Sequence, residues 1–105
     1  MANYCSNFIK ITGNQEQLKE FREKHCNLNV VNDDSFFESI IRTTDPYDSW
    51  GTRSDVYDMD VVDNGDNMTV SFLTVWNSCR PIIKKLHAMY PNLNLEYSVI
   101  LVVIH

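Results

Sequence analysis

The side chains best able to do chemistry in this sequence are aspartates gathered between Trp50 and Trp76. Alternate residues of a strand lie about 7 Å apart on one face, so Asp58 and Asp60 could share a hard cation such as Mg²⁺, joined by Asp55 or Glu96. Paired acids on an edge strand also prevent edge-to-edge aggregation, and this second interpretation is favoured. We therefore predict no metal site. The acids of this stretch are Asp55, Asp58, Asp60, Asp63 and Asp66.

Nucleophiles and general bases are present without a local motif. The chain has three cysteines, an odd count with no C-x-x-C spacing, which argues against a disulfide framework or a zinc site. We expect buried thiols in a reducing cytoplasm. No Walker loop, G-x-G-x-x-G or H-E-x-x-H segment occurs, so we predict no catalytic residues, no cofactor and no enzymatic activity. The candidate residues were Cys5, Cys26, Cys79, His25, His87 and His105.

Length and composition indicate one domain, residues 1–105, with 44% hydrophobic residues and a net charge of -5. The acidic balance argues against a general phosphate-binding surface. The first residues lack a basic region followed by an apolar run, and the apolar run of residues 99–104 is too short to cross a bilayer. We therefore expect a cytoplasmic protein with no membrane partner.

The elements that would position these residues follow from periodicity. Strands are predicted at residues 4–12, 55–62, 68–76 and 93–104, with helices after Asn14 and from Pro81 to Tyr90. Residues 27–50 are expected to be an irregular connection. This order predicts an α+β, ferredoxin-like split β-α-β sandwich, in which a four-stranded antiparallel sheet carries two helices on one face.

The central hairpin is the clearest local prediction. Alternation directs Tyr57, Met59 and Val61 toward the core, and Asp58 and Asp60 outward from an edge strand. The Asn-Gly pair at 64–65 predicts a type I′ turn, and the returning strand lies inside the sheet. The last strand, apolar on both faces in its second half, is expected to be an inner strand or a contact with another chain.

Several segments resemble the YubB-type ferredoxin-like family of plasmid and phage proteins: ANYCSN at the start, WGTRSD, FLTVW, and YPNLNLEY near the end. The resemblance spans nearly the whole chain. It implies the same fold and a mobile-element origin, and it implies no activity. The chain departs from the family pattern at Ser54, at residues 77–81 and in its apolar tail.

Nucleic-acid binding is not expected. Ferredoxin-like RNA-binding sheets stack bases on strand aromatics within a basic frame, and here that frame and the K/R-G-F/Y segment are missing. Most of the candidate aromatics have a parity that directs them to the core: Phe8, Tyr57, Phe72, Trp76 and Tyr97. The acids could instead imitate a row of phosphates, although a solvated acidic face is the simpler interpretation.

The favoured function is non-catalytic binding of a host protein, with a nucleic-acid enzyme and a defence factor as the two candidate partners, in which the chain acts as a modulator or a trigger. The residues predicted to contact it are Trp50, Arg53, Asp55, Asp58, Asp60, Asp63 and Asp66. A first alternative is a small ligand-binding or enzymatic domain built on Trp50, Arg53, Asp55 and Trp76. A second is self-assembly through the apolar last strand, which would make the chain a homo-oligomer.

Overall fold

The computed structural model describes residues 3–27, 35–52, 55–75 and 77–103. Its order of elements is that of an α+β domain, with the predicted strands and helices in sequence and one additional short helix. The elements are β1 (Asn3–Gly13), α1 (Gln15–His25), α2 (Pro46–Ser49), β2 (Tyr57–Asp63), β3 (Asn67–Val75), α3 (Arg80–Met89) and β4 (Leu93–Val103).

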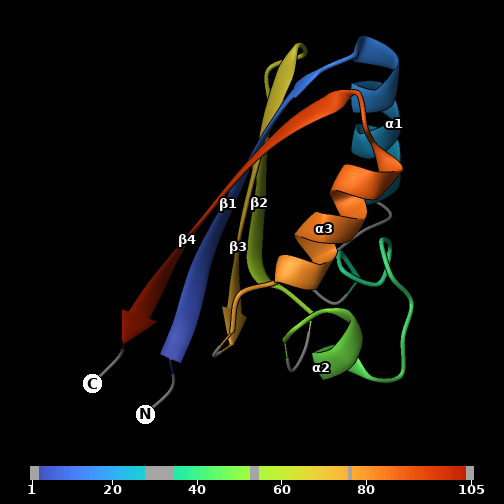
Figure 1. Ribbon diagram of the computed structural model, residues 1–105. Coiled ribbons are helices and arrows are strands. Elements are labelled where there is room, and N and C mark those ends of the chain that lie inside the picture. The colour runs from blue at the N-terminus through green and yellow to red at the C-terminus, as the bar shows by residue number, and fades with distance from the viewer. Residues whose placement is uncertain (1–2, 28–34, 53–54, 76, 104–105) are drawn as a thin grey trace.

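The four strands form one open antiparallel sheet in the order β2-β3-β1-β4 (Figure 1). The prediction that the strand carrying Asp58 and Asp60 lies at an edge is confirmed, as is the inner position of β3. Of the two alternatives for the last strand, the inner position is wrong, and the contact with another chain stays a prediction. Among the strands that the structure describes, β4 forms the opposite edge, because it pairs with β1 alone.

Helices α1 and α3 cover one face of this sheet (Figure 1). The Asn14 side chain caps α1 as predicted, since it accepts the backbone N–H of Gln17 at 3.0 Å. Cys79, and not Asn77 or Ser78, is the N-cap of α3, and it makes no capping bond through its side chain. Met89 was expected to face inward and is 37% exposed.

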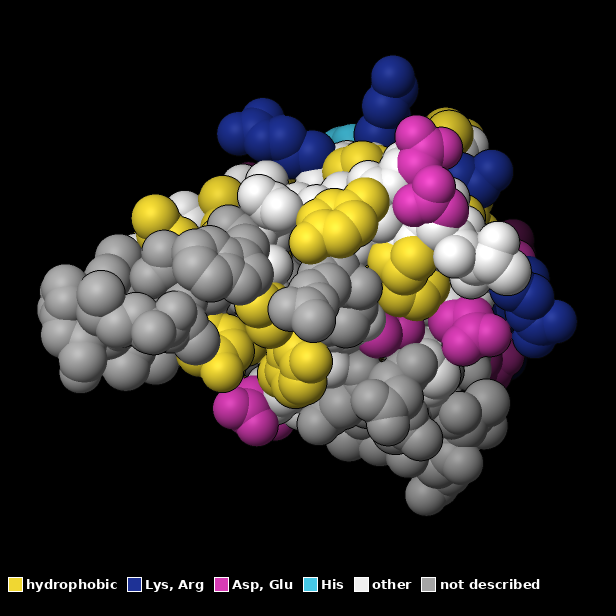
Figure 2. Space-filling model, turned by 90° about the horizontal axis from the view of Figure 1, so that it is seen from below, with side chains coloured by type: hydrophobic (Ala, Val, Ile, Leu, Met, Phe, Trp, Pro, Cys, Tyr) yellow, Lys and Arg dark blue, Asp and Glu magenta, His cyan; other side chains and the backbone are white. Residues whose placement is uncertain are grey.

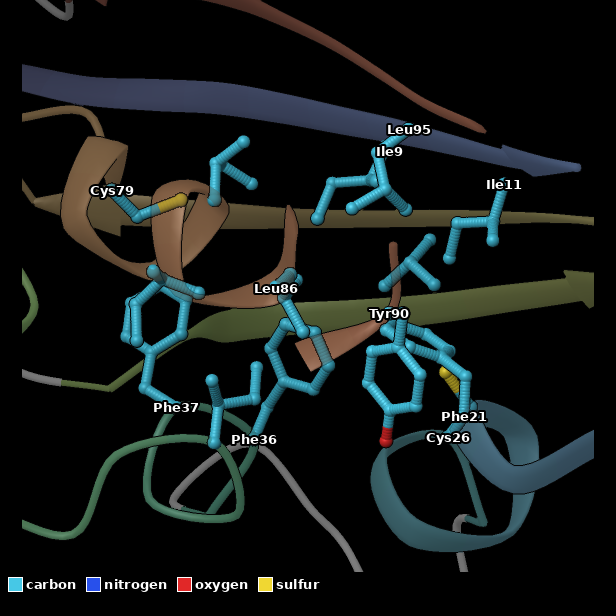
Figure 3. Close-up of a cluster of buried hydrophobic side chains, with 14 of the residues drawn as sticks. Ile9, Ile11, Phe21, Cys26, Phe36, Phe37, Cys79, Leu86, Tyr90 and Leu95 are labelled. Atoms are coloured by element: carbon cyan, nitrogen blue, oxygen red, sulfur yellow. The ribbon is translucent and has the colours of Figure 1, made fainter. Parts of the chain in front are cut away.

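The core lies between the sheet and these helices, and Figure 3 shows side chains of both layers pointing toward one another. Odd-numbered residues of β1 and even-numbered residues of β3 supply the sheet side, as alternation predicted. Fully buried members from sheet and helices include Ile9, Ile11, Leu18, Phe21, Met68, Val70, Ile82 and Leu86.

The described part of the predicted irregular connection is packed. Phe36 and Phe37 are fully buried and both lie beside Phe72 of β3, with ring centroids 5.4 and 5.5 Å away. Pro46, in a segment whose sequence is typical of a turn, is the first residue of helix α2, and the side chain of Asp45 caps this helix. This segment therefore contributes side chains to the core and is not a peripheral loop.

The central hairpin differs from its prediction in two places. A β-bulge lies between Tyr57 and Asp60, so Asp58 and Met59 both face the single residue Phe72. Tyr57 consequently leaves the core and is 43% exposed. The type I′ turn at Asn64-Gly65 is also wrong. The backbone N–H of Asn64 donates to the carbonyl of Asn67 at 2.9 Å, so the central residues of the turn are Gly65 and Asp66, and only Gly65 has the positive φ that a type I′ turn needs at both.

Candidate functional site

The aspartates of β2 and its hairpin serve different roles. Asp58, Asp60 and Asp66 are exposed, and Asp58 and Asp60 form the part of the sheet border that we call the acidic edge. Asp63 instead forms an ion pair with Arg22 and accepts the backbone N–H of Gly65 at 2.9 Å. These contacts lower the pKa of Asp63, the Gly65 bond being the largest cause. Asp63 thus helps to fix the hairpin end against α1.

The bulge in β2 depends on Asp58, whose φ of 50° lies in the left-handed region. Aspartate tolerates this conformation better than most residues other than glycine and asparagine. Because the bulge adds one residue to the strand, Tyr57 moves to the same face as Asp60. Asp58 therefore determines which side chains β2 presents on the face of the sheet that α1 and α3 leave uncovered, which we call the open face.

An apolar cluster occupies the middle of the open face. Tyr57 lies directly across from Leu73, and Phe8 on β1 lies diagonally beside Leu73, since Ser6 is the partner of Leu73. Neighbouring strands are about 4.8 Å apart, so these three side chains occupy neighbouring positions on one face of the sheet. Phe8 is 41% exposed. We call Phe8, Tyr57 and Leu73 the open-face patch.

Charged groups border this patch. Asp60 is the cross-strand partner of Ser71, next to Leu73, and Lys10 pairs in register with Glu96 on β4. In the sequence Phe8 has the opposite strand parity to Ile9 and Ile11, whereas nothing in the pattern of residues 55–62 reveals the bulge. Tyr57 was therefore the member of the patch that sequence reasoning assigned to the core.

Two of the residues predicted to contact a partner lie inside the protein. Trp50 is buried, and its indole Nε1–H donates to the backbone carbonyl of Ile41 at 2.7 Å. Gly51, beside it, has a φ of +79°, and a Cβ there would come within 2.8 Å of Pro81. The W-G-T segment is therefore packed against the start of α3, and its role there is structural.

Asp55 is buried as well. Its carboxylate accepts backbone N–H groups of Phe37 at 2.8 Å, Glu38 at 3.2 Å and Val56 at 2.8 Å. Burial raises the pKa of Asp55, and the three backbone hydrogen bonds oppose that rise. Its role is to hold the turn of residues 35–40 against β2. Arg53 and Trp76, the other members of the predicted ligand cluster, lie outside the described residues.

No cation site forms around the acids. Asp55 is engaged by three backbone donors, and Glu96 lies on β4, at the opposite edge of the sheet from Asp58 and Asp60. Within the described ranges, no three His, Cys, Asp or Glu side chains come together closely enough to hold a metal ion.

The cysteines have the properties of structural thiols. Burial raises the pKa of Cys26 and of Cys79 to about 12 in each case, so both are protonated thiols at neutral pH. Cys79 lies beside a buried polar cluster in which Tyr97 donates its hydroxyl proton to the side-chain oxygen of Asn7. The side-chain nitrogen of Asn7 in turn donates to Thr74 at 3.0 Å. These bonds satisfy polar groups inside the sheet–helix interface.

Both ring nitrogens of His25 are engaged in hydrogen bonds within the core. Ser39 donates its hydroxyl proton to the carbonyl of Phe36, so its oxygen accepts from Nδ1–H of His25, and Nε2 accepts from the Tyr90 hydroxyl. Burial, assisted by Lys24, lowers the pKa of His25 to about 4. The ring is neutral at pH 7, and its partners are core residues. Neither His25 nor the buried cysteines form a catalytic arrangement.

Helix α3 carries a cationic surface with Arg80, Lys84 and Lys85. Arg80, Lys84 and His87 rim an open hollow of about 370 Å³ above Ile83 and Tyr97. Helix α3 itself contains no acidic residue. Figure 2 shows lysine and arginine side chains projecting from the surface at several places, some of them beside acidic side chains. This hollow is a possible site for an anionic group on an apolar body.

Comparisons of the chain with protein-family models, with curated proteins and with solved structures each gave no match. The resemblance to the YubB-type family therefore remains a prediction. Among the described helices, none has the length and apolar character needed to cross a membrane.

Proposed function

We propose that this chain is a ferredoxin-like, non-catalytic protein-binding domain whose partner contacts the open-face patch and the acidic edge. The strand order β2-β3-β1-β4, with helices α1 and α3 on one face, supports the ferredoxin-like assignment. The observation that carries the function is the patch itself. Three adjacent apolar side chains, Phe8, Tyr57 and Leu73, lie on a sheet face that neither of these helices covers.

The charges around the patch favour a protein over a nucleic acid. Asp58 and Asp60 stand at its border, and Lys10 lies in register with Glu96. A nucleic acid stacked on Phe8 and Tyr57 would bring its phosphates toward these carboxylates, which disfavours binding. The buried thiols and the neutral, enclosed His25 offer no nucleophile or base to a substrate.

The chemistry of the surface defines the expected partner. An apolar centre calls for aliphatic or aromatic side chains, and an acidic border calls for lysine or arginine around them. The mobile-element origin implied by the sequence resemblance points to a host protein as the bearer of such a surface. That host partner, and the cytoplasmic location that goes with it, remain predictions.

Crosslinking in host cells followed by mass spectrometry would identify the partner, and its dissociation constant would then be measured with purified variants. We expect Phe8→Ser and Tyr57→Ser each to weaken binding at least tenfold, since exposed aromatic anchors dominate interface energies. The double variant Asp58→Asn/Asp60→Asn should mainly slow association. Tyr47→Ser is the matched control, because Tyr47 is 60% exposed and lies on α2, outside the sheet that carries the patch.

The proposal would be overturned if Phe8→Ser and Tyr57→Ser bound the partner as tightly as the unmodified chain while remaining folded. Circular dichroism and thermal melting of each variant separate a lost contact from a lost fold. Activity that released a chemically altered small molecule would also contradict the non-catalytic assignment.

The hollow beside α3 favours a second candidate, binding of a small anionic molecule with an apolar body. It replaces the Trp50/Asp55 cluster as the place to look for a ligand. Titration with phenyl phosphate, followed by NMR, should shift the amide signals of Ile83 and Tyr97. Arg80→Ala and Lys84→Ala should abolish those shifts, whereas Lys19→Ala, on exposed α1 surface, should leave them. Unchanged signals in the titration would exclude this candidate.

A further inference from the structure

The two edges of the sheet differ in their protection against strand pairing. The β2 edge has seven residues, a bulge and three exposed aspartates, all of which hinder the addition of another strand. β4 has eleven residues and pairs with β1 in an unbroken register from Asn3 to Gly13. Glu96 is its only charged residue. Eleven residues give β4 a length of about 35 Å, which is roughly twice that of a usual strand.

The second half of β4 is also uncovered on its faces. Leu93 and Leu95 are buried beneath the helices, whereas Ile100 is 62% exposed and Leu101 is 57% exposed. These two neighbours point to opposite faces of the sheet, so neither face is covered at this position. Figure 1 shows β1 and β4 running on past α3 to the end where both termini lie, and Figure 2 shows hydrophobic side chains exposed at that end.

We propose that β4 pairs with β4 of a second copy of this chain, in antiparallel orientation about a two-fold axis near Ile100. The two sheets then form one continuous eight-stranded sheet. Each copy supplies the backbone groups that the other lacks along this edge, and Ile100 and Leu101 of both copies become buried together.

The charges of the chain favour a second copy as the occupant. With the axis at Ile100, uncharged residues oppose one another over residues 97–103, and the two Glu96 positions lie about 27 Å apart. Both acidic edges are then at the far ends of the combined sheet, which minimises repulsion between chains of net charge -5. Because β2 resists pairing, assembly stops at the dimer. This inference rests on the β4 edge. Ile100, the cross-strand partner of Ser6, lies on the same sheet face as Phe8, whereas Leu101, the partner of Cys5, lies on the other face, so Leu101→Lys tests the dimer without altering the open-face patch.

Sedimentation equilibrium over a range of protein concentrations tests the inference on the full chain. We expect a monomer–dimer equilibrium, and we expect Ile100→Lys and Leu101→Lys each to raise the dissociation constant of the dimer at least tenfold. Val62→Lys is the matched control. Val62 is an exposed aliphatic residue on the opposite edge strand, 49% accessible, and its replacement should leave the equilibrium unchanged.

A crosslinking readout reports the geometry. Ile100→Cys should form an interchain disulfide under mild oxidation, and Val62→Cys should not, since the three native cysteines are buried. Two results would each overturn the inference: a monomer at every concentration, or a dimer that survives both lysine substitutions. A folded monomer that still binds its partner through Phe8 and Tyr57 would overturn the dimer and leave the proposed function standing.

Discussion

Asp55 shows how one buried carboxylate organises a connection that has little regular structure. It accepts the backbone N–H groups of Phe37, Glu38 and Val56, and it is 8% exposed. Asp55 therefore joins two segments of the chain. Phe37 and Glu38 lie 18 and 17 residues before it, and Val56 is the residue that follows it.

Replacing Asp55 should therefore destabilise the fold. Asp55→Ala leaves three backbone donors without their acceptor, and we expect a loss of about 2–4 kcal/mol in the free energy of unfolding. Asp55→Asn keeps one acceptor oxygen and should cost less. Urea denaturation measures both, with Asp66→Ala, at the exposed hairpin tip, as a control expected to change stability by under about 0.5 kcal/mol. Equal stability of Asp55→Ala and the unmodified chain would contradict the role assigned to Asp55.

His25 predicts a dependence of stability on pH. In the unfolded chain its imidazole takes up a proton near pH 6.5, whereas burial lowers the pKa in the folded protein to about 4. Between these values the unfolded state binds more protons, so the free energy of unfolding falls as the pH is lowered from 6.5 to 4. We expect a loss of about 2–3 kcal/mol from this residue over that window.

Denaturation curves at pH 7, 6, 5 and 4 measure this loss. His25→Gln removes the titrating ring, so the decline over the window should be smaller by a comparable amount. His87→Asn alters an exposed histidine on α3 and should keep the full decline. A decline that is the same in His25→Gln as in the unmodified chain would exclude His25 as its source.

At the scale of the element, the bulge in β2 depends on the backbone at Asp58. Glycine adopts a φ of 50° without the steric penalty that a Cβ brings, so Asp58→Gly should be neutral or stabilising by up to about 1 kcal/mol. Asp58→Val should destabilise by about 1–2 kcal/mol, because a β-branched residue is poorly tolerated there. Thermal melting of both variants checks the order. Asp60→Val, one exposed aspartate further along β2, should cost less than Asp58→Val.

The elements themselves could be predicted from periodicity, because alternation and helical spacing report burial on one face. Ile9 and Ile11 in β1, and Leu86 in α3, were assigned correctly for this reason. The strand parity of Tyr57 could not be predicted. A bulge shifts the parity of every residue on one side of it, and an aspartate in the left-handed region leaves no distinctive pattern in the sequence.

For the candidate site, too, alternation predicted some residues correctly and tertiary packing determined the others. The exposure of Asp58 and Asp60 came from alternation near a sheet edge, and it holds in the structure. The burial of Trp50 and Asp55 depends on contacts with Ile41 and Phe37, which belong to a segment whose short apolar run has no decisive period. Tertiary packing, which a single sequence does not encode locally, determined the place of these two residues.

At the scale of the whole molecule, charge is separated between the acidic edge and helix α3. We expect no measurable binding of single-stranded RNA or DNA oligonucleotides at physiological salt, because the aromatic patch lies on the acidic side. Fluorescence anisotropy tests this. Asp58→Lys/Asp60→Lys reverses the charge beside Phe8 and Tyr57 and should produce weak, salt-sensitive binding. Tight binding by the unmodified chain would contradict the assignment of the open face to a protein partner.

Dimerisation through β4 would place two open-face patches on one continuous sheet. A partner with two suitable surfaces, or one that is itself dimeric, would then bind with avidity. Surface plasmon resonance on a densely coated partner should show slower dissociation for the unmodified chain than for Ile100→Lys. At low partner density the two should dissociate at similar rates. Identical dissociation on the dense surface would argue against bivalent contact.

The three cysteines give the protein a set of internal reporters. Cys5 lies near the start of β1, Cys26 at the end of α1 and Cys79 at the start of α3, and all three are buried thiols. A thiol reagent added to the folded chain reaches each sulfur only when its surroundings open. Labelling rates read by mass spectrometry would thus time the opening of three separate regions without any substitution, and labelling of Cys5 would show whether the uncovered end of the sheet opens before the core.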